Sequence, residues 1–219
     1  MPRRRRSSTS AEVETRPWGE QLALDDASYR AQIAYLLERS PFYREKLGSS
    51  VSDRLADIAQ LPLTAKEELR ATVTPESPFG AHLCAEPSEL VRIYSTSGTT
   101  GAPSYIPLTA RDLDNWVTAS ARSYAASGIA VGQRIVSTYN AGPFVAGAAL
   151  GAFERLGLTH IPVGTGNTDR LVRAVEQLRP HAVVLTPSYA AHLAESFDLR
   201  GSSVAVSYTH LTLPTIYSV

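Results

Sequence analysis

Residues 158–186 read LTHIPVGTGNTDRLVRAVEQLRPHAVVLT, and this stretch decides the fold. Its first part, Leu158–Val163, and its last part, Ala182–Thr186, are short apolar runs of the kind that form buried strands. Between them, Thr168–Arg179 predicts a helix that ends before Pro180. A strand, a helix and a second strand within one short stretch indicate a parallel βαβ unit.

The same alternation continues on both sides of this stretch. Arg134–Tyr139 predicts an earlier strand, and Phe144–Leu156 predicts a helix that is apolar almost all round and therefore buried on several sides. Pro187 opens another helix. The pattern as far as residue 196 predicts an α/β fold, with a mainly parallel sheet and helices on both faces. Ligands of such sheets bind beyond the carboxyl ends of the strands.

The residues before this alternation predict a small helical segment. The apolar spacing in Asp26–Arg39 predicts an amphipathic helix, and Pro41–Leu47 predicts a short helical turn after it. Thr64 and Glu67 have the spacing of a capping box, in which the Thr64 hydroxyl would accept a hydrogen bond from the Glu67 N–H. We therefore expect another helix to start there and to end near Thr72.

Both ends of the chain differ from its body. Residues 1–20 contain an Arg and Ser run that cannot bury apolar surface, so a disordered, solvated tail is expected there rather than a phosphate-binding arm. Residues 206–215 match the translation of a transposase sequencing adaptor without a mismatch. Residues 206–219 are therefore expected to be a non-native tail rather than a native strand, which leaves a partial domain over residues 21–205.

The composition excludes several classes of protein. The 219 residues contain 21 basic and 21 acidic side chains, so no overall charge attracts nucleic acid or an anionic membrane. The single cysteine, Cys84, excludes an internal disulfide and indicates a reducing compartment, which predicts a cytoplasmic location. His82 and Cys84 lie near no further cysteine, so no metal ligands are assigned. The chain has no apolar run long enough to span a membrane.

Residues 95–103 read STSGTTGAP and carry the chemistry. They lie between two predicted strands, Val91–Thr96 and Tyr105–Leu108. Gly98 and Gly101 allow a close approach of the backbone to a ligand, and consecutive N–H groups in such a turn bind anions. With the hydroxyl donors, the stretch is suited to hold phosphate. It lacks the Lys-Ser/Thr pair of the common P-loop, and composition alone fits a flexible hairpin loop equally well.

Thr96–Gly101, followed by Pro103, resembles the signature loop of the adenylate-forming superfamily, the acyl-CoA synthetases and their relatives. Further stretches resemble the phenylacetate–coenzyme A ligase family within it: Leu61–Arg70, Val91–Ile93, Phe153–Gly157, Ile161–Val163 and Thr186–Ala190. The resemblance covers residues 29–196. It implies that residues 21–205 are the N-terminal part of the large adenylation domain, and that the natural protein continues past residue 205.

The resemblance implies an ATP-dependent carboxylate–CoA ligase with ATP, Mg²⁺ and coenzyme A as cofactors. A small carboxylic acid would form an acyl-adenylate, and coenzyme A or another thiol would then displace AMP. The β- and γ-phosphates would lie against Ser97, Gly98, Thr99, Thr100 and Gly101. A homodimer is possible. The family's motifs for adenine, magnesium and ribose, and its late lysine, are absent from these 219 residues, so no catalytic residue is assigned and the chain alone is expected to be inactive.

The acid pocket is expected at the strand ends. Tyr139 and Phe144 match the family's spacing for an aromatic pair that lines an aryl-acid pocket, and ordinary core packing is the alternative. Ser188 and Tyr189 follow another strand and are expected to border the same pocket. Asn140–Pro143 departs from the Gly-rich sequence that is typical of phenylacetate ligases at this position. The resemblance therefore implies an aromatic or similar acid and does not identify it as phenylacetate.

Two other functions fit the same residues. One is a short, non-catalytic module that binds a nucleotide or an acyl group. The other is an adenylating enzyme that transfers the acyl group to a carrier-protein thiol or to an amine. Ser104 stands where the wider superfamily often has lysine. His160 lies in an apolar predicted strand, so we expect a hydrogen-bonded histidine of the core or of a sheet edge rather than a catalytic base.

Overall fold

The computed structural model describes residues 12–96, 103–139, 146–197 and 201–209. These residues fall into two compact units that divide at residue 110. The described residues up to 110 form the hairpin unit, and those from 111 onward form the sheet unit. The sheet unit contains the predicted strand–helix alternation, and the hairpin unit contains the Ser/Thr/Gly-rich stretch.

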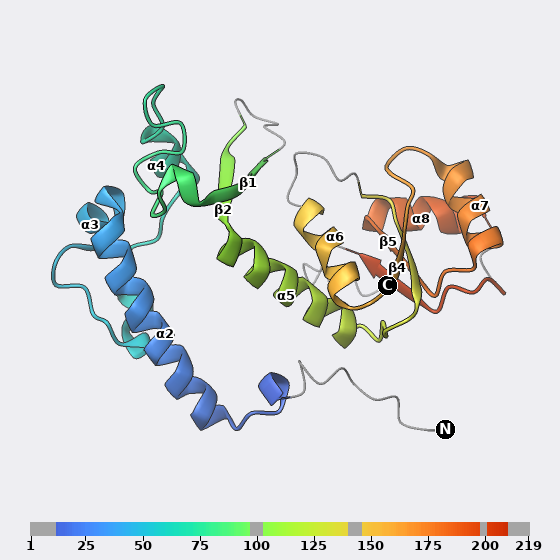
Figure 1. Ribbon diagram of the computed structural model, residues 1–219, viewed down its shortest axis with the longest axis horizontal. Helices are drawn as coiled ribbons and strands as arrows, with labels where there is room; N and C mark the ends of the chain where they lie inside the picture. The colour runs from blue at the N-terminus through green and yellow to red at the C-terminus, as the bar shows by residue number, and fades with distance from the viewer. Residues whose placement is uncertain (1–11, 97–102, 140–145, 198–200, 210–219) are drawn as a thin grey trace. The chain divides into compact units, whose positions relative to one another are not determined.

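The hairpin unit combines helices with one antiparallel pair of strands (Figure 1). Its elements are α2 (Trp18–Arg39), α3 (Pro41–Leu47), η1 (Leu55–Gln60), α4 (Lys66–Ala71), η2 (Pro87–Glu89), β1 (Leu90–Ser95) and β2 (Tyr105–Thr109). The two strands pair from Leu90 opposite Thr109 to Ser95 opposite Tyr105. The runs predicted on either side of the Ser/Thr/Gly stretch are therefore the two arms of one hairpin.

Helix α2 begins earlier than the sequence predicts. It starts at Trp18, directly after Pro17, whose carbonyl accepts hydrogen bonds from the N–H groups of Glu20 and Gln21. The expected tail boundary at residue 20 therefore falls inside a helix. Apolar spacing does not indicate the first turns of α2, because Trp18 is 71% exposed and does not belong to a buried apolar stripe.

The predicted capping box of the next helix is wrong by one position. Helix α4 has Ala65 as its N-cap, and the carboxylate of Glu68 accepts a hydrogen bond of 2.6 Å from the Ala65 N–H. A complete capping box also needs a side-chain oxygen at the N-cap, which would accept a hydrogen bond from the helix backbone. Alanine has no such oxygen, so the bond predicted for the Thr64 hydroxyl has no counterpart at Ala65. Glu68 is left as the group that fixes the first turn of α4.

Ser40 fixes the corner between α2 and α3. Its side chain is fully buried and accepts a hydrogen bond of 3.3 Å from the Tyr43 N–H as the N-cap of α3. The same hydroxyl donates to the Ala81 carbonyl at 2.9 Å. The Phe42 N–H also bonds the Ala81 carbonyl, so the corner is attached to a distant segment of the chain.

The sheet unit is a four-stranded sheet with helices between its strands. Its elements are α5 (Ala110–Ala126), β3 (Arg134–Ser137), α6 (Ala146–Arg155), β4 (Thr159–Pro162), α7 (Thr168–Leu178), β5 (Ala182–Leu185), α8 (Pro187–Ser196) and β6 (Val206–Thr209). The spatial order is β4-β3-β5-β6, and each neighbouring pair is parallel. The predicted α/β fold with a parallel sheet is confirmed.

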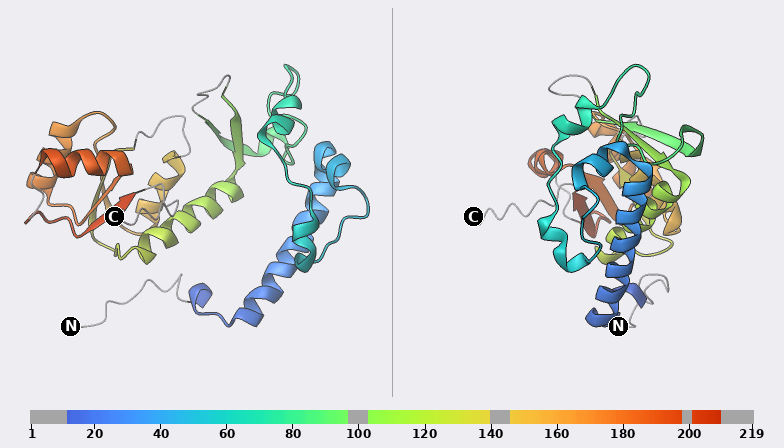
Figure 2. Two further views of the ribbon diagram at one scale, coloured as in Figure 1. Left: turned by 180° about the vertical axis from the view of Figure 1, so that it is seen from behind. Right: turned by 90° about the vertical axis from the view of Figure 1, so that its left-hand side faces the viewer.

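Helices cover both faces of this sheet (Figures 1 and 2). Residues that alternate along a strand face opposite sides, so Ala182 and Val184 pack with α5 and α6, whereas Val183 and Leu185 pack with α7 and α8. Phe153 of α6 is fully buried on the first face. The two faces therefore hold separate hydrophobic clusters.

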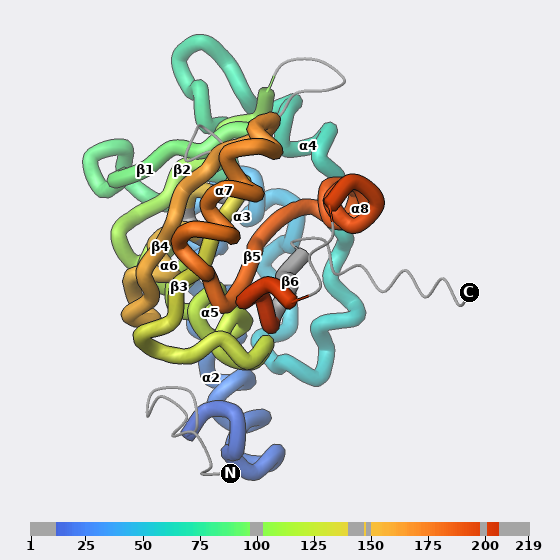
Figure 3. The backbone as a smooth tube through the Cα atoms, turned by 90° about the vertical axis from the view of Figure 1, so that its right-hand side faces the viewer, coloured from blue at the N-terminus to red at the C-terminus, as the bar shows by residue number. Residues whose placement is uncertain are grey.

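Strand β6 occupies the position beside β5 (Figure 3). Its four residues pair from Ala182 opposite Val206 to Leu185 opposite Thr209. These residues belong to the segment that matches an adaptor translation, and its origin stays a prediction. The two observations are compatible, because a sheet ladder is formed by backbone groups and Val, Tyr and Thr have high strand propensity.

Candidate functional site

Two hydrogen bonds close the hairpin at the base of the Ser/Thr/Gly stretch. The Thr96 N–H donates to the Ser104 carbonyl at 3.0 Å, and the Ser104 N–H donates to Thr96 Oγ1 at 3.0 Å. Thr96 and Ser104 are referred to as the loop stem. The predicted phosphate ligands Ser97, Gly98, Thr99, Thr100 and Gly101 lie outside the described residues. The stem therefore fixes where that stretch leaves and re-enters the hairpin.

A charged side chain reaches the loop stem from helix α4. Arg70 Nε donates a hydrogen bond of 3.2 Å to Ser104 Oγ, across 34 positions of the sequence. Arg70 is half-buried. A guanidinium is always protonated, so this contact brings a permanent positive charge to the stem.

Helix α4 is itself attached to helix α3. The ammonium of Lys46, whose side chain is only 12% exposed, pairs with the carboxylate of Glu68. The hydrogen bond from Lys46 holds the pKa of Glu68 below its ordinary value, and the N–H of Ala65 acts in the same direction. The charge on Glu68 therefore anchors the helix that presents Arg70.

The carboxyl ends of β3, β4 and β5 lie at one edge of the sheet, where the fold predicts ligands. Thr138 follows β3 and is buried. Its N–H donates to the Val184 carbonyl at 3.1 Å, and its hydroxyl contacts the same oxygen at 3.4 Å. The chain therefore stays bonded to β5 until Thr138, one residue before Tyr139.

The predicted acid-pocket residues fall into separate environments. Tyr139 is 8% exposed and belongs to the cluster on the α5 and α6 face. Tyr189 packs against the cluster on the opposite face, and its hydroxyl donates to Thr168 Oγ1 at 3.0 Å. Ser188 is exposed and lies 3.3 Å from Thr186 Oγ1. Phe144 lies outside the described residues, so the aromatic pair is not tested.

No protein-family profile matches the chain. The chain is 39% identical over 199 residues to the phenylacetate–coenzyme A ligase of Thermus thermophilus, which covers 88% of the chain and 43% of that ligase. It is 33% identical over 179 residues to the phenylacetate–coenzyme A ligase of Pseudomonas putida, covering 78% and 39%. The chain belongs to the phenylacetate–coenzyme A ligase family. It spans less than half the length of these relatives.

A solved structure agrees with this assignment to the phenylacetate–coenzyme A ligase family. A 2-hydroxyisobutyryl-CoA ligase, in complex with 2-HIB-AMP and CoA in the thioesterification state, superposes with a TM-score of 0.77 at 30% identity. The match covers 88% of the chain and 42% of that ligase. The α/β fold predicted from the strand–helix alternation is thus the fold of an acyl-CoA ligase.

One polar pair in this family member escapes sequence reasoning. Ser137, which is fully buried, lies with its Oγ 2.7 Å from His160 Nε2, and the His160 ring lies 4.8 Å from the Phe153 ring. Burial lowers the pKa of His160, and the charge of Glu154 opposes this. The pair satisfies polar groups on the α5 and α6 face, and His160 is a half-buried, hydrogen-bonded histidine on β4, the outer strand of the described sheet, as expected for an edge position.

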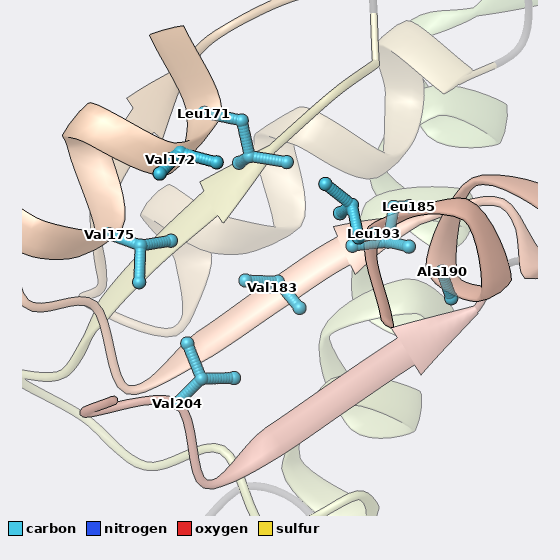
Figure 4. Close-up of a pocket in the computed structure, with 8 residues that line it drawn as sticks. All are labelled: Leu171, Val172, Val175, Val183, Leu185, Ala190, Leu193 and Val204. Carbon is cyan, nitrogen blue, oxygen red and sulfur yellow. The ribbon is translucent and has the colours of Figure 1, made fainter. Parts of the chain in front are cut away.

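The pocket between α7 and α8 does not suit a carboxylic acid (Figure 4). It has a volume of about 100 Å³ and is lined only by aliphatic side chains: Leu171, Val172, Val175, Val183, Leu185, Ala190, Leu193 and Val204. A carboxylate placed there would lose its hydration without gaining a hydrogen-bond donor from any of these side chains. The pocket is therefore not assigned as the acid site.

The described residues contain no cluster of three or more His, Cys, Asp or Glu side chains that could hold a metal ion. His82 Nδ1 lies 3.2 Å from Thr72 Oγ1, and Cys84 Sγ donates to the His82 carbonyl at 3.5 Å. Burial lowers the pKa of His82 and raises that of Cys84.

None of the helices in the described part of the chain is long and apolar enough to cross a membrane.

Proposed function

We propose that the complete protein carrying this chain is an AMP-forming ligase that joins a small carboxylic acid to coenzyme A. The observation that carries the proposal is the closed stem of Thr96 and Ser104 beneath a Ser/Thr/Gly stretch, in a chain 39% identical to a phenylacetate–coenzyme A ligase. The similar ligase solved with an acyl-AMP and CoA supports the same chemistry.

The proposed reaction has two displacements. A carboxylate oxygen attacks the α-phosphorus of ATP, the P–O bond to pyrophosphate breaks, and an acyl-adenylate forms. The sulfur of the deprotonated thiol of coenzyme A then attacks the acyl carbon, and the C–O bond to AMP breaks. The protein contributes position and fixed donors, because negative charge on the phosphate oxygens must be stabilised as it moves.

We assign two groups of residues to this reaction. The phosphate ligands are proposed to be Ser97, Gly98, Thr99, Thr100 and Gly101, which the loop stem presents. The acid is proposed to lie at the end of β3, with Tyr139 and Phe144 as its wall and with Ser188 and Tyr189 at its border. Because Tyr139 and Tyr189 pack on opposite faces of the sheet, an acid that meets both must lie over the carboxyl edge.

The cofactors of this proposal are ATP, Mg²⁺ and coenzyme A. In phosphoryl-transfer sites Mg²⁺ is bound through one or two carboxylates and the substrate phosphates, and the described residues offer no metal-binding cluster of their own. We therefore assign no step to a metal ligand of this chain. A homodimer in a reducing cytoplasm completes the proposal, and light scattering of the complete protein measures the oligomeric state.

The test is acid-dependent exchange between ATP and labelled pyrophosphate by the complete protein, followed by detection of the CoA thioester. Phenylacetate, benzoate and 2-hydroxyisobutyrate serve as the acids, and omission of the acid is the control. We expect exchange with at least one aromatic acid and thioester only when coenzyme A is added. Absence of exchange with every acid refutes the ligase. Adenylate formation without transfer to coenzyme A favours a carrier-protein or amine acceptor instead.

A further inference from the structure

The Ser/Thr/Gly stretch carries no positive charge of its own. Residues 95–104 contain neither lysine nor arginine, although the proposed ligand is a triphosphate with several negative charges. Neutral hydroxyl and N–H donors form charge-assisted hydrogen bonds to a phosphate oxygen, but they lack the Coulombic attraction that a positively charged donor adds. A cation from another element of the protein would therefore strengthen a phosphate site built from this stretch.

Helix α4 provides a cation at the base of this stretch. Arg70 Nε donates to Ser104 Oγ at 3.2 Å, and the Ser104 N–H donates in turn to Thr96 Oγ1 at 3.0 Å. These two bonds connect the guanidinium to both arms of the loop stem. A guanidinium has five N–H donors in a planar fork and is always charged.

The position of Arg70 is fixed by the first turn of its helix. Glu68, two residues earlier, pairs with Lys46 of α3 and accepts a hydrogen bond of 2.6 Å from the Ala65 N–H. Lys46 Nζ also lies 5.9 Å from the centre of the Phe42 ring. A largely buried lysine side chain therefore holds α4 in place, and α4 holds the guanidinium at the stem.

We propose that Arg70 is a positioning residue of the phosphate site, which anchors the loop stem through Ser104 and supplies the positive charge that the loop lacks. The inference rests on the proposed use of ATP and extends it to a residue outside the loop. Two properties of Arg70 are required together. The hydrogen bond to Ser104 sets the stem, and the charge attracts the triphosphate.

Three variants of the complete protein separate these two properties. Arg70→Gln removes the charge and keeps an N–H donor, Arg70→Lys keeps the charge and loses the planar fork, and Ser104→Ala removes the anchor. Arg92→Gln is the matched control, because Arg92 is exposed on β1 of the same hairpin and its contact is the Tyr94 hydroxyl at 3.2 Å.

The expected result is a change in ATP binding with little change in folding. We expect Arg70→Gln to raise the KM for ATP by about 10- to 100-fold, as for loss of a charge-assisted hydrogen bond. Arg70→Lys should recover part of this loss, and Arg92→Gln should leave the KM unchanged. The effect of Arg70→Gln should shrink as salt is added, because screening weakens the charge in the parent protein. Equal KM values for the parent and Arg70→Gln overturn the inference.

A binding measurement separates this inference from the proposed function. Inorganic tripolyphosphate is titrated into the 219-residue chain at low ionic strength by calorimetry, with no acid and no turnover. We expect binding that Arg70→Gln weakens and Arg92→Gln does not. If the parent chain binds tripolyphosphate in this way but the complete protein activates no acid, the ligase fails and the role of Arg70 stands. The role of Arg70 is overturned if the parent chain does not bind tripolyphosphate. It is also overturned if the weaker binding of Arg70→Gln is fully explained by a lower melting temperature of that variant.

Discussion

The hairpin unit and the sheet unit are held together by different forces. The sheet unit buries apolar side chains on two faces, and Ile135, Val136, Phe153 and Val184 have no exposed surface. Among the described residues of the hairpin unit, the buried hydrophobic side chains are Ile33, Tyr94 and Leu108. Its helices are joined mainly by polar contacts, such as those of Ser40 and Lys46. Substitutions that leave cavities should therefore damage the sheet unit most, and loss of polar partners should damage the hairpin unit.

The largest expected effect is in the core of the sheet unit. Phe153→Ala removes a fully buried ring that lies 4.9 Å from Tyr124 and 4.8 Å from His160. The lost burial and the cavity should lower the free energy of unfolding by about 3–5 kcal/mol. Urea denaturation with hydrogen exchange read in β3 and β5 measures this. Val131→Ala, at a site 66% exposed, is the control, and an equal loss in both variants would contradict the layered core.

A smaller effect is expected at the polar corner of the hairpin unit. Ser40→Ala removes the N-cap of α3 and the hydrogen bond to Ala81, which should cost about 1–2 kcal/mol. Hydrogen exchange of α3 and of residues 80–84 should report the loss together, because one hydroxyl joins both segments. Ser28→Ala removes an exposed hydroxyl on α2 and is the matched control. Faster exchange confined to α3 would show that the bond to Ala81 adds nothing.

The smallest effect is a pH dependence that comes from one half-buried histidine in each unit. Burial lowers the pKa of His160 in the folded sheet unit, so the unfolded chain binds its proton more readily. The free energy of unfolding should therefore be highest above the ordinary histidine pKa of 6.5 and fall as the pH drops through that value. Burial lowers the pKa of His82 in the hairpin unit as well, so that unit should also weaken as the pH falls through 6.5. The lowered pKa of Glu68 should weaken the hairpin unit further only below its ordinary value of 4.5. Urea titrations at pH 5.5 and 8, with His160→Gln as the control, test this. A pH dependence of the sheet unit, read by hydrogen exchange in β3 and β5, that persists in His160→Gln would assign the effect to another group.

The sequence predicts the sheet unit better than the hairpin unit, for a physical reason. Strand β5 is a short apolar run between Pro180 and Pro187, so neighbouring residues in the sequence indicate both its burial and its boundaries. Helix α2 has Ile33 as its buried residue, so most of its length gives no amphipathic signal. Its start at Trp18 and the shift of the α4 cap to Ala65 could not be predicted from apolar spacing.

The candidate site shows the same limit. The Ser/Thr/Gly stretch and its two strands are visible in the sequence, and the resemblance to the ligase family supplies their meaning. The contact from Arg70 to Ser104 spans 34 positions, and that from Ser137 to His160 spans 23, so no local pattern encodes either. The opposite faces of Tyr139 and Tyr189 depend on the path of the chain after each strand, which residue types alone do not specify.

Strand β6 has a practical consequence for anyone who attaches foreign sequence to this domain. The edge of β5 pairs with a neighbouring strand through backbone N–H and carbonyl groups. A purification tag or reporter with high strand propensity, joined after Ala205, would therefore pair with β5 at the position of β6. Such an appendage would alter the measured melting of the domain and shield an edge that other chains could use. A spacer rich in proline, which lacks the required N–H, would keep an added segment out of the ladder.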